Sequence, residues 1–108
     1  MTIFAQLTRI RNFERKHFPF LITIEDFDIV RVIGLHQESN KPILLKQLFL
    51  EGIGSYATIT RRLRILRKNE VVVAESHGVD RRSITLTLSP GLVKAYARYA
   101  LLLAGPTQ

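Results

Sequence analysis

Basic side chains gather in one short stretch of this sequence, residues 55–68. The stretch holds no acidic residue, and its cations are Arg61, Arg62, Arg64, Arg67 and Lys68. A guanidinium presents several N–H donors in a rigid fork, which matches the paired acceptor atoms of a phosphate or of the guanine edge. The stretch therefore predicts a surface for an acidic partner, and nucleic acid is the commonest such partner of a basic protein.

Small and hydrogen-bonding residues begin the same stretch: Ser55, Tyr56, Ala57, Thr58 and Thr60. A helix that enters the major groove of double-stranded DNA needs such residues near its N-terminus, because they can approach the base edges closely. Arg61 and Arg64 suit bidentate contacts with guanine. Arg62, Arg67 and Lys68 fall where phosphate contacts are expected. The alternative is that these arginines form only a solvated face.

A second basic cluster lies in a polar turn, residues 76–82. Arg81 and Arg82 place two guanidiniums where they can reach an adjacent, narrow minor groove. Asp80 would repel DNA if it were unpaired, so we expect it to orient one of these arginines through a bidentate ion pair.

The composition of the 108-residue chain excludes several kinds of site. It has no cysteine, which rules out disulfides, thiolate metal sites and cysteine nucleophiles. His17, His36 and His77 lack the close spacing of a metal site or an acid–base pair, and no glycine-rich phosphate loop occurs. We therefore expect no enzyme activity, no metal and no cofactor. With a net charge of +7 and no signal or membrane-spanning segment, the chain is predicted to be cytoplasmic, without a membrane partner.

Hydrophobic periodicity predicts the helix that carries the basic stretch. Ile59, Leu63 and Leu66 recur at helical spacing on one side, and Ser55 is placed to cap the N-terminus. Asn69 is expected to end this helix in a left-handed conformation, which asparagine tolerates better than most residues.

Two more helices are predicted ahead of it. Thr23 is placed to cap a helix that runs to about His36, with Asp26 as the acidic member of a capping box. Another helix is expected from Pro42 to about Glu51, since proline is tolerated at the first helical position.

The order of the elements predicts a fold class. The sequence Gly52-Ile53-Gly54 supplies a tight turn between two helices, and residues 71–75 and 83–88 predict the two strands of a hairpin. Helix, turn, helix and hairpin in this order are typical of a winged helix-turn-helix. The predicted fold is therefore mainly α with a small β-hairpin (α+β).

Helices are predicted at both ends of the chain. The first, over residues 3 to 16, has apolar residues at helical spacing with arginines between them, and the second, over residues 90 to 105, is apolar nearly all round. The second carries only Lys94 and Arg98 as charged residues, and a chain of this size has too little surface to cover it. We therefore expect a homodimer. The residues expected at its interface are Ile3, Phe4, Leu7, Tyr96, Tyr99, Leu102 and Leu103. The domain organisation predicted is one domain, residues 1–108, with dimerisation helices in 1–20 and 90–105 and a winged-helix core in 24–89.

Three short strings resemble the winged-helix domain of the multiple-antibiotic-resistance regulator (MarR) family of bacterial transcription factors. Residues 55–63, Ser-Tyr-Ala-Thr-Ile-Thr-Arg-Arg-Leu, resemble the family's recognition helix, and residues 80–83 resemble its Asp-x-Arg wing signature. Residues 88–91 approximate the Leu-Thr-x-x-Gly that begins the following helix. The resemblance covers residues 24–104.

This resemblance implies a homodimer on a pseudo-palindromic site. The expected function is a sequence-specific transcriptional regulator, in the form of a repressor, that reads the major groove with helix 55–68 and the minor groove with wing 76–82. No effector ligand is assigned from the sequence. The alternative is a winged-helix module for protein contacts, or one that binds nucleic acid without sequence preference.

Overall fold

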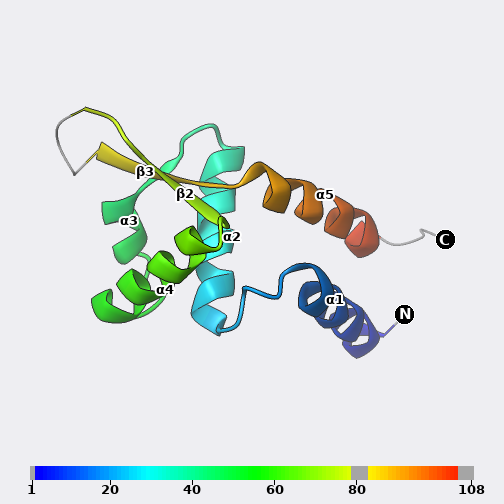
Figure 1. Ribbon diagram of the computed structural model, residues 1–108. Helices are drawn as coiled ribbons and strands as arrows, with labels where there is room; N and C mark the ends of the chain where they lie inside the picture. Colours follow the sequence, from blue (N-terminus) through cyan, green and yellow to red (C-terminus); the bar gives the residue numbers. More distant parts are fainter. Residues whose placement is uncertain (1, 79–82, 105–108) are drawn as a thin grey trace.

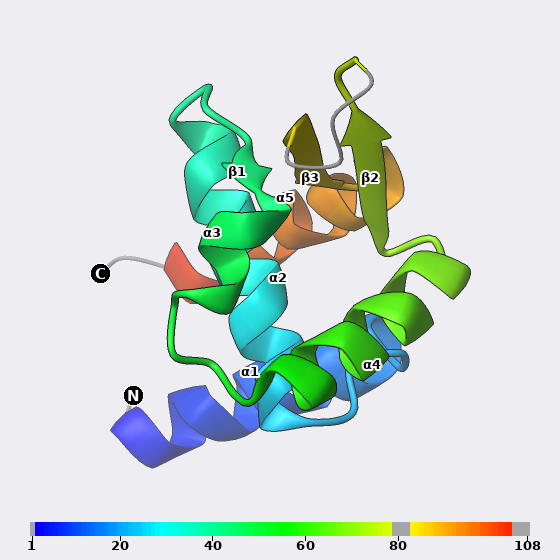
Figure 2. The same ribbon diagram turned by 90° about the vertical axis from the view of Figure 1, so that its left-hand side faces the viewer.

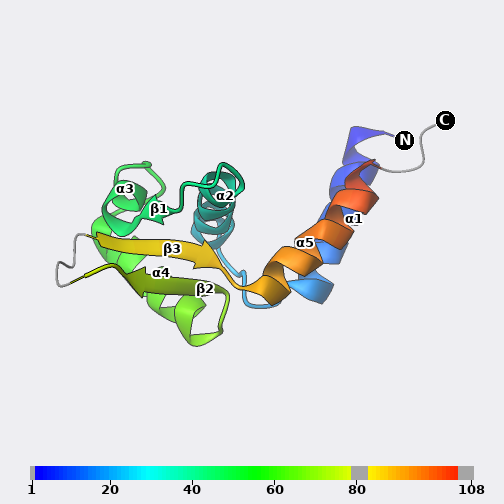
Figure 3. The ribbon, with the colours of Figure 1, turned by 90° about the horizontal axis from the view of Figure 1, so that it is seen from above.

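The computed structural model describes residues 2–78 and 83–104, with the backbone alone for residues 102–104. Its elements, in chain order, are α1 (Ile3–His17), α2 (Ile24–Glu38), β1 (Ile43–Leu44), α3 (Leu45–Phe49), α4 (Tyr56–Lys68), β2 (Val72–Ser76), β3 (Ile84–Leu88) and α5 (Pro90–Ala104). The middle helices and the sheet form a body, and α1 and α5 lie side by side as an arm that extends from it (Figures 1 and 3). The molecule is accordingly elongated, 53 × 27 × 23 Å. No helix within the described residues is long and apolar enough to span a lipid bilayer.

The hairpin predicted from the alternating residues is confirmed. β2 and β3 pair antiparallel, with Val72 opposite Leu88 and Ser76 opposite Ile84. A third strand, β1, lies on the other side of β3, so the order in the sheet is β1-β3-β2. The chain is thus mainly helical with a small antiparallel sheet, as the sequence predicts.

The helix predicted from Pro42 to about Glu51 is confirmed only over Leu45–Phe49, and its predicted start is wrong. Residues 43 and 44 form β1 instead, because Ile43 pairs with Leu86 of β3 and is fully buried there. The helix α3 that follows is only five residues long. The Gln47 side chain accepts the backbone N–H of Leu44 at 3.0 Å and so helps to fix the change from strand to helix.

The core joins α2, α4 and the sheet. The predicted stripe of α4 is buried, since Ile59, Leu63 and Leu66 are at most 5% exposed. α2 contributes Ile29 and Ile33, both fully buried, and Figure 2 shows α4 crossing in front of this helix. Burying a side chain of this size stabilises the fold by about 1.5–3 kcal/mol, so these facing stripes hold the two helices together.

An aromatic cluster joins the arm to the body. Phe18, only 1% exposed, stacks on Tyr96 of α5 with ring centroids 4.4 Å apart, and Phe13 of α1 lies 5.0 Å from Tyr99. Burial raises the pKa of the Tyr96 hydroxyl to about 12. The two tyrosines predicted at a dimer interface therefore pack on aromatic rings of their own chain and keep part of their surface exposed, and their place in a dimer interface stays a prediction.

Two helices end in the same hydrogen-bonded motif. After α4, the N–H of Val71 donates to the carbonyl of Leu66 at 2.9 Å and the N–H of Glu70 to that of Arg67 at 3.0 Å. This is the Schellman pattern, which requires a left-handed conformation at the first residue after the C-cap. That residue is Glu70, with φ of 59°, and not Asn69, whose φ of −89° is ordinary. The prediction for Asn69 is therefore wrong by one position, and α2 ends in the same way at Asn40, φ 59°.

Replacing Glu70 with glycine should stabilise the protein. Glycine has no Cβ to clash in the left-handed region, so we expect Glu70→Gly to raise the free energy of unfolding by about 1 kcal/mol. Urea denaturation measures the change. Asn69→Gly is the matched control and should lower stability, because it adds backbone freedom and removes the hydrogen bond from Asn69 Nδ2 to the Ile65 carbonyl. The opposite pattern would place the left-handed residue at 69.

Candidate nucleic-acid interface

The N-terminus of α4 is fixed by the predicted cap. The Ser55 hydroxyl accepts the backbone N–H of Thr58 at 3.2 Å and donates to the Thr58 hydroxyl at 3.0 Å. Gly52, with φ of 75°, makes the turn that leads into the helix. Both hydroxyls are engaged in the cap, and Ala57 beside them is exposed.

An aromatic stack lies at the same end of α4. The Tyr56 ring packs on Phe49 of α3, with centroids 4.5 Å apart and ring planes inclined by 25°. Tyr56 nevertheless remains 71% exposed, so most of its surface is open to solvent. The sequence identified Tyr56 as a surface residue of the interface, but nothing in the spacing indicated Phe49 as its support.

Four cations of α4 are exposed: Arg61, Arg64, Arg67 and Lys68. In the described part of the chain none of these four has an acidic partner within ion-pair distance. α4 lies along the outside of the body (Figure 2), and its own sequence contributes no carboxylate to neutralise the charge. The exposed side of α4, which we call the cationic face, therefore carries a concentrated positive potential.

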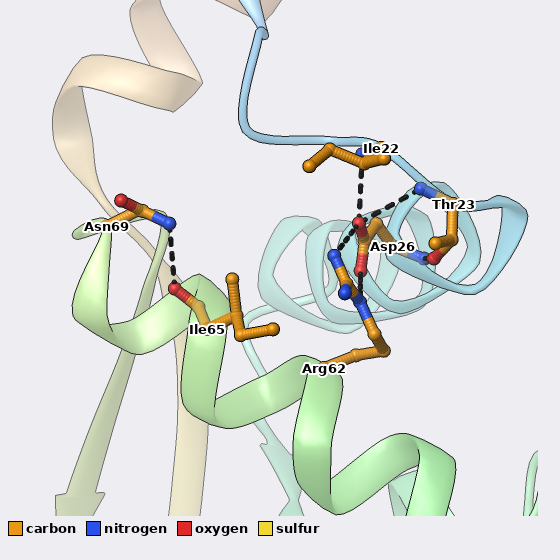
Figure 4. A network of polar contacts seen from close by, with 6 residues as sticks. All are labelled: Ile22, Thr23, Asp26, Arg62, Ile65 and Asn69. Carbon is orange, nitrogen blue, oxygen red and sulfur yellow. Dashed lines mark hydrogen bonds and ion pairs between the residues drawn. The ribbon is translucent and has the colours of Figure 1, made fainter.

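The fifth cation, Arg62, points the other way. Its Nε donates to Asp26 Oδ1 at 2.7 Å and its Nη2 to Asp26 Oδ2 at 2.6 Å, and only 11% of its side chain is exposed (Figure 4). The phosphate contact predicted for Arg62 is therefore corrected to an internal, bidentate ion pair. The signal in the sequence is its position, three residues after Ile59 and four before Leu66, which lies on the inward stripe of the helix.

Asp26 is fully buried, and its environment favours the ionised form. Burial alone would raise its pKa, but the hydrogen bonds from Arg62 and from the backbone N–H groups of Ile22 and Thr23, together with the charge of Arg62, lower that pKa below its usual value. The hydrogen bond with Asp26 raises the pKa of Arg62 in turn. The pair therefore stays doubly charged at neutral pH, and the predicted capping box is confirmed as one part of this network.

Thr60 does not offer its hydroxyl to solvent. It lies beside an open groove of about 1200 Å³ between α4 and the sheet, whose lining includes Leu63 and Val72. Its Oγ1 is buried, and among the described residues it is a side-chain oxygen without a hydrogen-bond partner. The prediction that Thr60 reaches a base edge is therefore corrected.

The hairpin carries the wing. His77 lies at its described end, where its Nε2 is 3.0 Å from Thr85 Oγ1 and 3.7 Å from Glu75 Oε2. Gly78 has φ of 95° where the chain turns. The predicted wing residues Asp80, Arg81 and Arg82 lie outside the described residues. Nowhere in residues 2–78 and 83–104 do three potential metal-ligating side chains come together.

Comparison with known proteins supports the fold. Neither a protein-family model nor a curated protein sequence matches this chain. Among solved structures, it is similar to a transcriptional regulator of the MarR family from Silicibacter pomeroyi, with a TM-score of 0.56 and 16% sequence identity. The likeness covers 93% of this chain and 65% of that regulator, so the chain spans less than two thirds of the regulator's length. At this identity the likeness shows the fold alone, and the predicted winged-helix fold is confirmed.

Removing the charge of Asp26 should cost far more stability than removing that of Asp28, which pairs at the surface with Arg31 at 3.3 Å. We expect Asp26→Asn to lower the free energy of unfolding by about 3–5 kcal/mol at neutral pH, because Arg62 is left buried without its partner. Asp28→Asn, the matched control, should cost at most about 1 kcal/mol.

The difference between wild type and Asp26→Asn should also depend on pH. The folded-state pKa of Asp26 is lowered, so its contribution is fully present above the unfolded pKa of about 3.9 and is lost as the pH falls through the folded value. Urea denaturation at a series of pH values measures this. A difference that stays constant down to the lowest pH would contradict the ionised pair.

Proposed function

We propose that this protein is a DNA-binding transcriptional regulator that inserts α4 into the major groove of double-stranded DNA. The observation that carries the proposal is the cationic face of α4, which has no acidic partner among the described residues and lies on the outside of a winged-helix body. DNA phosphates supply most of the attraction for such a face. In this fold the second helix of the helix-turn-helix, here α4, is the one presented to DNA.

The roles within α4 follow from position along the helix. Tyr56 and Ala57 are exposed near its N-terminus, where a recognition helix contacts base edges. Arg61 and Arg64 are in its middle and suit guanine, while Lys68, in the last turn, suits a phosphate. Ser55 and Thr58 cap the start of the helix. Their hydroxyls can therefore contact DNA only through hydrogen bonds that the cap does not already use.

The wing contributes through the minor groove in this proposal. A hairpin beside a recognition helix can follow the backbone to the adjacent groove, and a narrow minor groove attracts arginine. Arg81 and Arg82 are the wing residues proposed for this contact, with Asp80 orienting one of them.

We also propose that two copies act together as a homodimer through the arm. The arm exposes Ile3 (60%), Phe4 (76%) and Leu101 (76%), an unusual amount of apolar surface for adjacent ends of two helices. Leu7, also in α1, is 48% exposed, and Leu102 and Leu103, whose side chains are not described, complete the proposed interface. A dimer presents two copies of α4 to a pseudo-palindromic site in the cytoplasm, and bound at a promoter it would act as a repressor.

Substitutions on the cationic face should separate base contacts from phosphate contacts. With a preferred sequence selected from a random DNA pool, Arg61→Ala should weaken binding by about 1–3 kcal/mol and relax the base preference. Lys68→Ala should weaken binding to all DNA sequences alike. It should also lower the slope of log affinity against log salt concentration by about one, because one phosphate contact is lost. Fluorescence anisotropy at several salt concentrations measures both.

Arg31→Ala is the matched control, because it removes the same charge from an exposed arginine of α2 that is paired with Asp28. It should leave base preference unchanged. If Arg61→Ala and Lys68→Ala both weaken binding to every DNA sequence equally, the protein binds DNA without sequence preference. If the wild type does not bind DNA at all, the alternative of a module for protein contacts is favoured.

Light scattering tests the dimer. We expect wild type to have twice the mass of one chain at micromolar concentration, and Phe4→Ser to shift it toward the monomer, because a hydroxymethyl group cannot replace the buried ring. Leu50→Ser is the control, since Leu50 is 77% exposed and directly follows α3, a helix that lies away from the arm (Figure 1). Equal behaviour of the two variants would rule out α1 as the interface.

A further inference from the structure

The Asp26 carboxylate joins three parts of the chain. Its Oδ2 accepts the backbone N–H groups of Ile22 at 2.9 Å and Thr23 at 3.1 Å, and both oxygens accept from Arg62 (Figure 4). Ile22 and Thr23 belong to the segment that connects α1 to α2. One buried carboxylate thus ties the connecting segment and the start of α2 to the middle of α4.

The connecting segment is itself anchored to the arm. Phe18 and Leu21 are 1% and 4% exposed, and the N–H of Leu21 donates to the Phe18 carbonyl at 3.1 Å. Phe18 also stacks on Tyr96 of α5. Packed and hydrogen-bonded contacts therefore run without a gap from α5 through Phe18 and the connecting segment to Asp26, Arg62 and α4.

The ion pair differs from the other contacts of α4 in being directional. The apolar stripe of the helix fixes which side faces inward, but apolar contacts tolerate small rotations because the hydrophobic effect has no preferred direction. Two parallel N–H···O bonds to one carboxylate allow much less rotation. α4 has 13 residues. It is therefore about 20 Å long, and a tilt of about 10° around Arg62 would move each end by about 2 Å.

We propose that Asp26 is a positioning residue that couples the arm to α4 through Arg62 and so sets the distance between the two recognition helices of a dimer. This inference rests on the proposed function. It adds that the preferred separation of the two DNA half-sites is set inside each chain, by a residue that itself touches no DNA.

Arg62→Lys tests the coupling. Lysine keeps the positive charge, so attraction to phosphates is unchanged, but it cannot form the two parallel hydrogen bonds. Affinity is measured for DNA probes whose half-site separation varies around about 10 base pairs, one helical turn. We expect the preference for the best separation over its neighbours to fall about tenfold, equivalent to about 1.4 kcal/mol, while the salt dependence stays the same.

Arg31→Lys is the control and should keep the wild-type preference, because Arg31 pairs at the surface within α2. Asp26→Asn is a second variant that should reproduce the effect of Arg62→Lys from the other side of the pair. A folded Arg62→Lys protein that keeps the wild-type preference overturns the inference, and so does a wild type that binds DNA without any preference for separation.

A measurement without DNA separates this inference from the proposed function. The chain has no cysteine, so Thr8→Cys on α1 and Lys68→Cys on α4 can carry a pair of spin labels. Labelled chains diluted into unlabelled protein report the distance within one chain. We expect Arg62→Lys to broaden the distance distribution relative to wild type, and an unchanged distribution overturns the coupling. A wild type with a narrow distribution and no affinity for DNA refutes the proposed function alone.

Discussion

A buried carboxylate needs a partner, and the partner of Asp26 fixes how α4 lies on the body. Removing a carboxylate from water costs several kcal/mol unless hydrogen bonds and an opposite charge offset the loss. Here two backbone N–H groups and a guanidinium do so. Because the guanidinium comes from α4, satisfying the charge on α2 also orients the helix that carries the cationic face. The remaining cations of α4 lie on its exposed side.

The sequence was sufficient to predict the long helices and the hairpin, but not the short elements between α2 and α4. The bounds of α4 and its Ser55 cap follow from local chemistry, in which a hydroxyl satisfies a free N–H and apolar residues recur every third or fourth position. β1 has two residues, too few to show any alternation, and it exists because Ile43 pairs with a strand some forty residues away. The left-handed residue falls at Glu70, since the hydrogen bonds of the whole last turn and not residue preference decide where the helix ends.

The candidate site was predictable in outline only. That residues 55–68 present arginines is evident from the sequence, but which of them are exposed depends on tertiary contacts. Arg62 lies on the inward stripe and pairs with Asp26, 36 positions earlier in the chain. No local sequence pattern predicts a pair so far apart. Tyr96 and Tyr99 were predicted at a dimer interface, and no pattern in the sequence showed that Phe13 and Phe18 of the same chain also pack on them. The roles of Arg81, Arg82 and Asp80 stay predictions.

The two sides of α4 perform separate tasks, and this division bears on how the protein can evolve. Ile59, Arg62 and Leu66 hold the helix in place, so changing them alters stability or orientation. Arg61 and Arg64 are exposed and unpaired within the described chain, so replacing them should leave the free energy of folding nearly unchanged. Mutations can therefore explore new ligand preferences on one side of a single helix while the scaffold beneath it stays intact.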